Sequence, residues 1–321
     1  MKLVTLLILL FATQVQAQTY YVAKTGSDAT GCALAVNPNT PKFTINSALA
    51  CVAKTLGAGA SKVVEVAAGI YVERIDSAVS PFPSGASWNR PFTLRAKPGD
   101  TVVIKNSGEF NIRIFSNAPQ YSIISGFTLD GSNLLQDSSQ IALGSCCNGG
   151  NYVRLQNLRL VNNVRTHGIF IGRFTHHSEV LNSVIHGGGF VYNGSGSAFS
   201  YPIYLEGSNN LFDGIELYDF PRYGIHAYSG YPEQPNANII RNCKIHDYGW
   251  AGFAQMAGVL IYGGNGNQVY GCSLWNGPNP ILIRPGATNT EIRDNLFVPP
   301  VGTSRPSAGK QLSSTSEATG P

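Results

Sequence analysis

A short apolar frame recurs along the chain and constrains its fold more than any other feature. Its longest copies are Asn210–Asp219, Asn238–Asp247 and Asn267–Asn276. The central six residues of each copy follow the pattern apolar-x-turn-x-x-apolar. The same pattern is found in four further stretches: Ile124–Leu129, Leu155–Leu160, Val180–Ile185 and Ile292–Phe297. The third position is always a type that tolerates a left-handed backbone: Gly126, Asn157, Asn182, Gly214, Asn242, Gly271 and Asp294. These positions lie 23 to 32 residues apart, a period typical of stacked units that bury their apolar faces on one another.

A further family of short apolar strands separates the frames, at residues 168–172, 202–206, 224–228, 258–262 and 280–284. Together with the two strands of each frame, they give three strands per turn. Because parallel strands with such short connections wind in one hand, the pattern predicts an all-β, right-handed, single-stranded parallel β-helix. A helix over residues 46–56, with Ile45, Ala48, Leu49 and Val52 on one face, is expected to cap the first coil.

The two ends of the chain differ from this domain, which we place at residues 18–298. Residues 1–17 resemble a signal peptide, with Lys2, an apolar run from Leu3 to Ala12 and a small-x-small cleavage site at Ala17. The run is shorter than the roughly 20 residues of a membrane span, so we expect a secreted or periplasmic monomer with no span after cleavage. Residues 299–321 are rich in Ser, Thr, Gly and Pro and are expected to be disordered.

Charge and cysteine content narrow the function classes. The net charge is +4, and no Lys/Arg run is present, which argues against nucleic acid as a partner. An exported chain with six Cys should pair most of them, and we expect a Cys32–Cys51 disulfide. Cys243 and Cys272 occupy the same frame position and are either a disulfide or buried thiols. No Cys or His spacing fits a metal site.

The opening of the chain resembles known β-helix proteins. Tyr20-Tyr21-Val22 followed by Gly26-Ser27-Asp28, then Pro41-x-Phe43-Thr44-Ile45 and Gly69-x-Tyr71-x-Glu73, are similar to the start of the pectin-lyase-like superfamily. The resemblance implies a carbohydrate-active β-helix whose relatives include calcium-dependent polysaccharide lyases. The catalytic segments of the polygalacturonases, pectinesterases, pectate lyases and alginate lyases are absent from this sequence. No catalytic residue and no calcium ligand can therefore be carried over.

The superfamily binds its substrates over the third family of strands, where two outward columns follow from the alternation of side chains. The candidates for catalysis are His226 as base, Glu206, and Arg284 as the cation that stabilises developing charge. Candidates for substrate binding are Tyr204, Tyr228, Tyr262, Phe170, Arg222 and Arg173. Aromatic faces and polar rims suit sugars; the alternative is that these rings only pack beneath loops.

Two function classes remain open from the sequence. The first is an exported enzyme that cleaves an acidic polysaccharide by β-elimination, with hydrolysis or epimerisation as further reactions. The second is a non-catalytic β-helix that binds a glycan or another surface. His186, His246, Tyr218 and Trp275 are expected to form a separate stacked ladder on another sheet.

Overall fold

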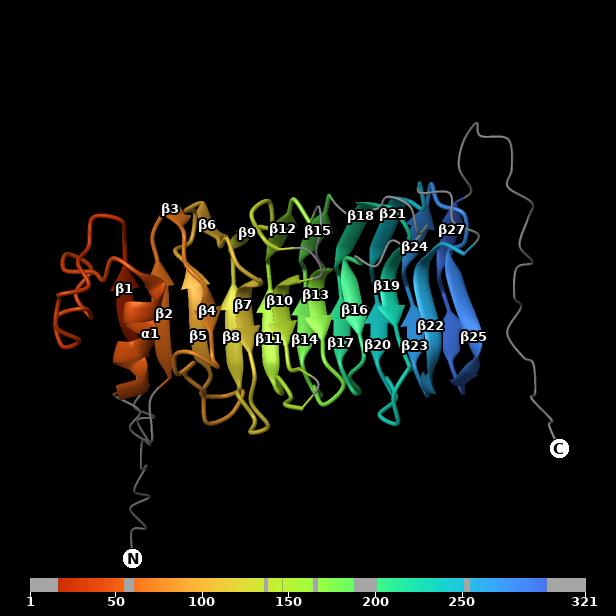
Figure 1. Cartoon of the computed structure of the whole chain (residues 1–321), viewed down its shortest axis with the longest axis horizontal. Helices are drawn as coiled ribbons and strands as arrows, with labels where there is room; N and C mark the ends of the chain where they lie inside the picture. The colour runs from red at the N-terminus through yellow and green to blue at the C-terminus, as the bar shows by residue number, and fades with distance from the viewer. Residues whose placement is uncertain are drawn as a thin grey trace, which may run out of the picture.

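The computed structural model describes residues 17–54, 61–135, 138–145, 147–163, 167–187, 201–250 and 255–298. In these residues, three parallel sheets wind into one elongated solenoid, with one helix at its N-terminal end (Figure 1). The predicted signal peptide, apart from its last residue Ala17, and the predicted C-terminal tail lie outside the described residues, as does Cys146. The predicted right-handed parallel β-helix is confirmed.

The sheets are lettered A, B and C in the order in which the chain enters them. Sheet A contains β1 (Gln18–Val22), β2 (Lys62–Val66), β5 (Phe92–Ala96), β8 (Ser122–Ser125), β11 (Val153–Gln156), β14 (Glu179–Leu181), β17 (Leu211–Asp213), β20 (Ile239–Arg241), β23 (Gln268–Tyr270) and β26 (Glu291–Arg293). Sheet B contains β3 (Gly69–Tyr71), β6 (Val102–Lys105), β9 (Thr128–Asp130), β12 (Arg159–Val161), β15 (Val184–His186), β18 (Glu216–Phe220), β21 (Lys244–Tyr248), β24 (Ser273–Trp275) and β27 (Leu296–Val298). Sheet C contains β4 (Ile75–Asp76), β7 (Phe110–Ile114), β10 (Ser139–Leu143), β13 (His167–Ile171), β16 (Ile203–Leu205), β19 (Tyr223–Ala227), β22 (Ala257–Asn265) and β25 (Ile281–Thr288).

The left-handed turn positions predicted from the sequence join sheet A to sheet B in the seven coils from β8 to β27. All seven have positive φ, between 46° and 81°. Their backbone amides continue the hydrogen bonding from coil to coil, as when Asn157 donates to the Leu181 carbonyl and Asn182 to the Asp213 carbonyl. The chain therefore makes a similar turn in each of these coils, and equivalent residues stack in columns.

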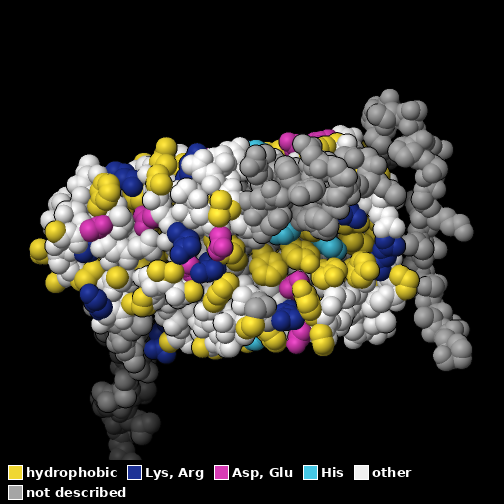
Figure 2. Space-filling model, viewed as in Figure 1, with side chains coloured by type: hydrophobic (Ala, Val, Ile, Leu, Met, Phe, Trp, Pro, Cys, Tyr) yellow, Lys and Arg dark blue, Asp and Glu magenta, His cyan; other side chains and the backbone are white. Residues whose placement is uncertain are grey.

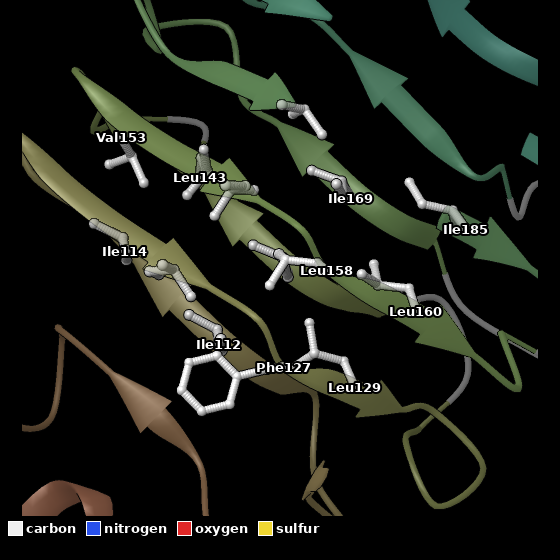
Figure 3. Close-up of a cluster of buried hydrophobic side chains, with 14 of the residues drawn as sticks. Ile112, Ile114, Phe127, Leu129, Leu143, Val153, Leu158, Leu160, Ile169 and Ile185 are labelled. Atoms are coloured by element: carbon white, nitrogen blue, oxygen red, sulfur yellow. The ribbon is translucent and has the colours of Figure 1, made fainter. Parts of the chain in front are cut away.

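The core is filled by the inward side of all three sheets. Ile112 and Ile114 on β7, Leu129 on β9 and Ile169 on β13 are fully buried and point into one shared interior (Figure 3). Each such side chain contributes roughly 1.5–3 kcal/mol by leaving water. This burial of one face per strand fixes which residues of sheet C must point outward.

A buried amide ladder supports the turn into sheet A. Asn238 accepts a hydrogen bond at Oδ1 from the backbone N of Asn210, at 3.0 Å, and Asn267 does the same for Asn238. All three side chains are at most 2% exposed. Each copy of the long sequence frame begins with one of them, because a buried backbone N–H needs a partner.

The N-terminal end is closed by α1 (Ile45–Lys54), whose buried face matches the predicted one. The Glu73 carboxylate accepts hydrogen bonds from the backbone N of Ile45 and Asn46, both at 2.9 Å. An acidic group at a helix N-terminus satisfies otherwise unpaired donors and complements the helix dipole. The predicted Cys32–Cys51 disulfide is present and ties the preceding loop to the helix.

The other cysteine pair has a different state. Cys243 and Cys272 are buried thiols on neighbouring coils, and the Cys272 sulfur accepts a hydrogen bond from the backbone N of Cys243 at 3.4 Å. Of the two alternatives that the sequence left open, the structure contains the thiols.

The turn column gives a test of the fold. Asn157 is exposed and has a φ of 53°, so its replacement changes backbone strain with little change in packing. We expect Asn157→Val to lower the free energy of unfolding by about 1–2 kcal/mol, because a β-branched residue is disfavoured in this conformation. The control Asn157→Gly should stay within roughly 0.5 kcal/mol of the parent. Urea denaturation followed by circular dichroism measures both; equal stability of the two variants would contradict the assigned turn.

Candidate functional site

Two columns of side chains stand on the outer face of sheet C. The strand register aligns Phe170, Tyr204, His226, Leu260 and Leu282 in one column. The residue two positions further along each of the last four strands forms the second column: Glu206, Tyr228, Tyr262 and Arg284. Figure 2 shows ring and apolar side chains gathered, together with His, Arg and acidic side chains, over the C-terminal half of this face. The columns predicted from the sequence are therefore neighbours in space.

Five tyrosine rings surround His226, and we refer to them as the tyrosine cage. The ring centroids lie 4.8, 5.1, 5.4, 5.5 and 6.4 Å from the imidazole, for Tyr201, Tyr223, Tyr204, Tyr228 and Tyr262 respectively. Tyr201 and Tyr223 are at most 4% exposed, whereas Tyr262 is 42% exposed. The cage thus has a buried floor and an accessible ring at its edge.

His226 itself is buried, at 8% exposure. Its Nδ1 atom has no hydrogen-bond partner among the described residues. Desolvation lowers the pKa of the imidazole to about 3, and the charges of Arg222 and His167 lower it further in the same direction. A pKa this low makes His226 a weak general base at neutral pH, because the rings that hold it also exclude water from its charged form. It remains a neutral hydrogen-bonding group.

Glu206 lies beside this cage and is 7% exposed. Burial raises the pKa of its carboxyl above the ordinary value, although a hydrogen bond from Tyr204 and the charge of Arg173 act in the opposite direction. Burial also raises the pKa of the Tyr204 phenol, and the neighbouring Glu206 charge adds to that increase. A buried carboxyl with a raised pKa is able to take up and release a proton closer to neutral pH.

Arg173 connects this carboxyl to a second acid. Its guanidinium lies 3.7 Å from the Glu233 carboxylate and 4.6 Å from the centroid of the Tyr231 ring. Glu233 and Tyr231 lie in the connection that follows β19, and sequence reasoning missed them. No periodic pattern in the sequence places this connection beside β13, which precedes Arg173.

The remaining candidates lie at the borders of the cage. Arg222 stacks on the Tyr223 ring, 4.7 Å from its centroid. Arg284 lies on β25, at the C-terminal end of sheet C, and donates a hydrogen bond to Gln255. The cation whose charge acts on Glu206 is Arg173 and not Arg284. Phe170 packs against Tyr204 at 5.8 Å between ring centroids, on the other side of the cage.

The cluster does not suit a calcium ion. Calcium takes about six to eight oxygen ligands, several of them carboxylates. Here Arg173 interacts with both carboxylates, and burial favours the protonated form of Glu206. Among the described residues, no three His, Cys, Asp or Glu side chains gather in a way that could hold a metal.

The expected second ladder stands on sheet B. His186, Tyr218, His246 and Trp275 stack in successive coils, with interplanar angles of 3° to 7°. Cross-strand stacking accounts for this arrangement, and that prediction is confirmed. No helix among the described residues is long and apolar enough to cross a bilayer.

Comparisons with known proteins agree on the architecture. A family model described as a right handed beta helix region matches residues 197–298. The chain has the right-handed parallel β-helix fold. PfbA, a surface adhesin of Streptococcus pneumoniae, aligns with a TM-score of 0.56 at 16% identity, over 79% of this chain and 68% of PfbA.

Polysaccharide lyases are also among the similar structures. A rhamnogalacturonan lyase aligns with a TM-score of 0.47 at 15% identity, over 88% of this chain and 68% of the lyase. The pectate lyase Pel9A aligns with a TM-score of 0.45 at 12% identity, over 89% and 78%. No curated protein matches the sequence. The family model and the PfbA structure support the β-helix fold, and at these identities the likeness assigns no activity.

The buried imidazole makes stability depend on pH. The pKa of His226 is about 3 in the folded protein against an ordinary 6.5, so protonation favours the unfolded chain. Its contribution is complete above pH 6.5 and is lost as the pH falls toward 3. His167, with a pKa lowered to about 4 by burial, adds to this loss.

We expect the free energy of unfolding to fall by about 1 kcal/mol or more per pH unit between pH 6 and pH 4. His226→Phe should reduce that slope, because it fills the cage without a titrating group. The matched control is Leu260→Phe, one strand away in the same column, which should leave the slope unchanged. Chemical denaturation at a series of pH values measures all three proteins; an unaltered slope in His226→Phe would show that His226 is not buried in its neutral form.

Proposed function

We propose that the protein is an exported carbohydrate-active protein that binds an acidic polysaccharide over sheet C and cleaves it by β-elimination. The observation that carries the proposal is the buried Glu206 carboxyl between the tyrosine cage and Arg173. The Cys32–Cys51 disulfide and the signal-like N-terminus support export, because disulfides persist in oxidising compartments.

Binding follows from the accessible edge of the cage. Tyr262 and Tyr228, with ring centroids 5.7 Å apart, offer aromatic faces to sugar rings, which bury apolar area against them. The unpartnered Nδ1 atom of His226 then makes a hydrogen bond with a sugar hydroxyl, as a positioning group. Arg173, Arg222 and Arg284 give this face a positive border that favours a polyanion.

The reaction assigns separate roles to the groups around Glu206. The ionised Glu206 carboxylate removes the proton on the carbon next to the uronate carboxyl group. Arg173 stabilises the negative charge that develops on that carboxyl group. The electrons of the broken C–H bond form a carbon–carbon double bond, and the glycosidic C–O bond breaks.

A tyrosine hydroxyl protonates the leaving oxygen. Burial and the Glu206 charge raise the pKa of Tyr204 and so disfavour it as the donor, and we assign this role to Tyr228.

Hydrolysis is the second candidate, and one observation favours it. Arg173 forms an ion pair with Glu233 and its charge acts on Glu206, so two carboxyl groups in different environments stand near one another. Most glycoside hydrolases use such a pair of carboxyl groups, and the carboxyl group with the raised pKa acts as the general acid. The two reactions differ in product, since only elimination yields an unsaturated sugar.

Glu206→Gln tests the catalytic role. We expect kcat on the best substrate among pectate, alginate and a glycosaminoglycan to fall by about 100-fold or more, with KM changed little, because the amide cannot take up the proton. Ultraviolet absorbance of the unsaturated product measures the rate. The parent enzyme should gain activity as the pH rises through the raised pKa of Glu206, since the base acts in its ionised form.

The control Glu233→Gln separates the two reactions. Elimination through Glu206 predicts that this variant keeps most of its activity, whereas hydrolysis predicts loss in both variants and reducing ends without ultraviolet absorbance. If the folded parent binds a glycan of the panel and no product of either kind appears, the non-catalytic glycan-binding function replaces the enzymatic one.

Tyr262→Ala tests binding separately from chemistry. Removal of this exposed ring should weaken binding by about 1–2 kcal/mol, in line with other aromatic contacts. Isothermal titration of the Glu206→Gln protein with the same polysaccharides measures the affinity without turnover. The matched control is Tyr270→Ala, whose ring stands on sheet A and should not affect this site; equal affinities of the two variants would contradict the assigned binding face.

A further inference from the structure

A second column of left-handed residues stands at the turn that leads into sheet A. In successive coils its members are Tyr121, Tyr152, His177, Asn209, Ala237, Gly266 and Asn289, with φ between 44° and 71°. The later coils use mostly small residues or Asn, which accept this conformation readily. The earlier coils instead place three ring side chains there, where bulky residues are disfavoured. Backbone sterics therefore do not explain the choice of rings.

These rings form a continuous surface, which we call the aromatic stack. Tyr152 and His177 are parallel to within 5°, with centroids 5.1 Å apart, and Tyr121 follows at 4.9 Å from Tyr152. Trp88 and His176 pack edge-on against Tyr121 and Tyr152. All five are half-buried except His177, which is exposed. The stack is thus accessible from outside along several coils.

The stack ends at His177, and an open shelf follows. The next two members of the column, Asn209 and Ala237, are exposed, and a Cβ atom built on Gly266 would meet nothing within 4 Å. Beside them, Leu211 and Ile239 point outward from β17 and β20 and are half-buried. One face of the His177 ring lies on Tyr152, and the His176 ring packs edge-on against His177 with centroids 5.0 Å apart. Beyond His177 the column continues with the small side chains of Asn209 and Ala237.

This surface differs from the tyrosine cage on sheet C in its charged residues. Arg154, which lies over the Trp88 ring, is paired with Glu179 at 2.6 Å. The four shelf residues named above, Asn209, Leu211, Ala237 and Ile239, carry no charge. Desolvation lowers the pKa of His176, as does the neighbouring His177. A polyanion would find no unpaired cation on the shelf.

We propose that the aromatic stack and the shelf form a second glycan-binding site, specific for neutral pyranose chains. A sugar ring stacks on His177 on the side away from Tyr152, where the column continues with Asn209 and not with another ring. The Asn209 amide hydrogen-bonds its hydroxyl groups, and the chain follows the solenoid axis, along which successive coils are about 4.8 Å apart. The site is independent of the sheet C cage and of its chemistry.

Two variants test the site, one by removing a ring from the stack and the other by adding a ring on the shelf. His177→Ala removes the stacking face, and Ala237 shows that alanine adopts this backbone conformation. Asn209→Tyr keeps the stack but fills the shelf with a ring, in a conformation that Tyr121 and Tyr152 already adopt. Trp275→Ala, in the stacked ladder of sheet B, is the matched control. Isothermal titration uses cellohexaose, xylohexaose and mannohexaose as probes, with thermal unfolding as the folding check.

The expected result is that at least one hexasaccharide binds, and that its Kd rises about tenfold or more in both His177→Ala and Asn209→Tyr, the loss that one aromatic contact typically brings. Trp275→Ala should bind as the parent does. Absence of binding by all three probes, an unchanged Kd in either folded variant, or loss of binding in Trp275→Ala would overturn the proposal. If one variant fails to fold, the other decides.

Discussion

In-register hydrogen bonding between successive parallel coils is the constraint on which this molecule depends. The bend from sheet A to sheet B takes place over a few residues in each coil, and it requires a left-handed residue at one position. Once that bend repeats, backbone groups of one coil pair with those of the next. The buried side-chain amides of Asn238 and Asn267 accept hydrogen bonds from backbone N–H groups that the turn leaves without a strand partner. The result is a stack in which the strand side chains form columns.

The chemistry of the sheet C face follows from this column geometry. Rings that stack on one outer face exclude water from whatever polar groups stand among them. His226 consequently stays neutral, and Glu206 retains its proton more readily than an exposed carboxyl. In the function proposed above, the same rings supply apolar contact area for a sugar, so the proposed binding surface and the pKa shifts belong to one desolvated cluster.

The two outer faces of the solenoid differ in charge, and the difference indicates different ligands. The sheet C face carries Arg222 and Arg284 beside the Arg173–Glu233 pair, whereas on the sheet A side Arg154 is paired with Glu179 and the shelf is uncharged. A protein with both sites would hold a neutral chain on one side while an acidic chain occupies the other. Such bivalent attachment raises the local concentration of substrate without any new contact at the reacting groups.

The sequence by itself determined the fold, the seven left-handed turns, the capping helix, the Cys32–Cys51 pair and the outward columns. Each depends on local pattern or on a period that repeats from coil to coil. Only the tertiary structure decided that His226 is neutral, that Arg173 is the cation that acts on Glu206, and that Glu233 and Tyr231 reach the same cluster. Those outcomes depend on irregular connections, whose paths no period encodes, and on desolvation, which sums over neighbours from several coils.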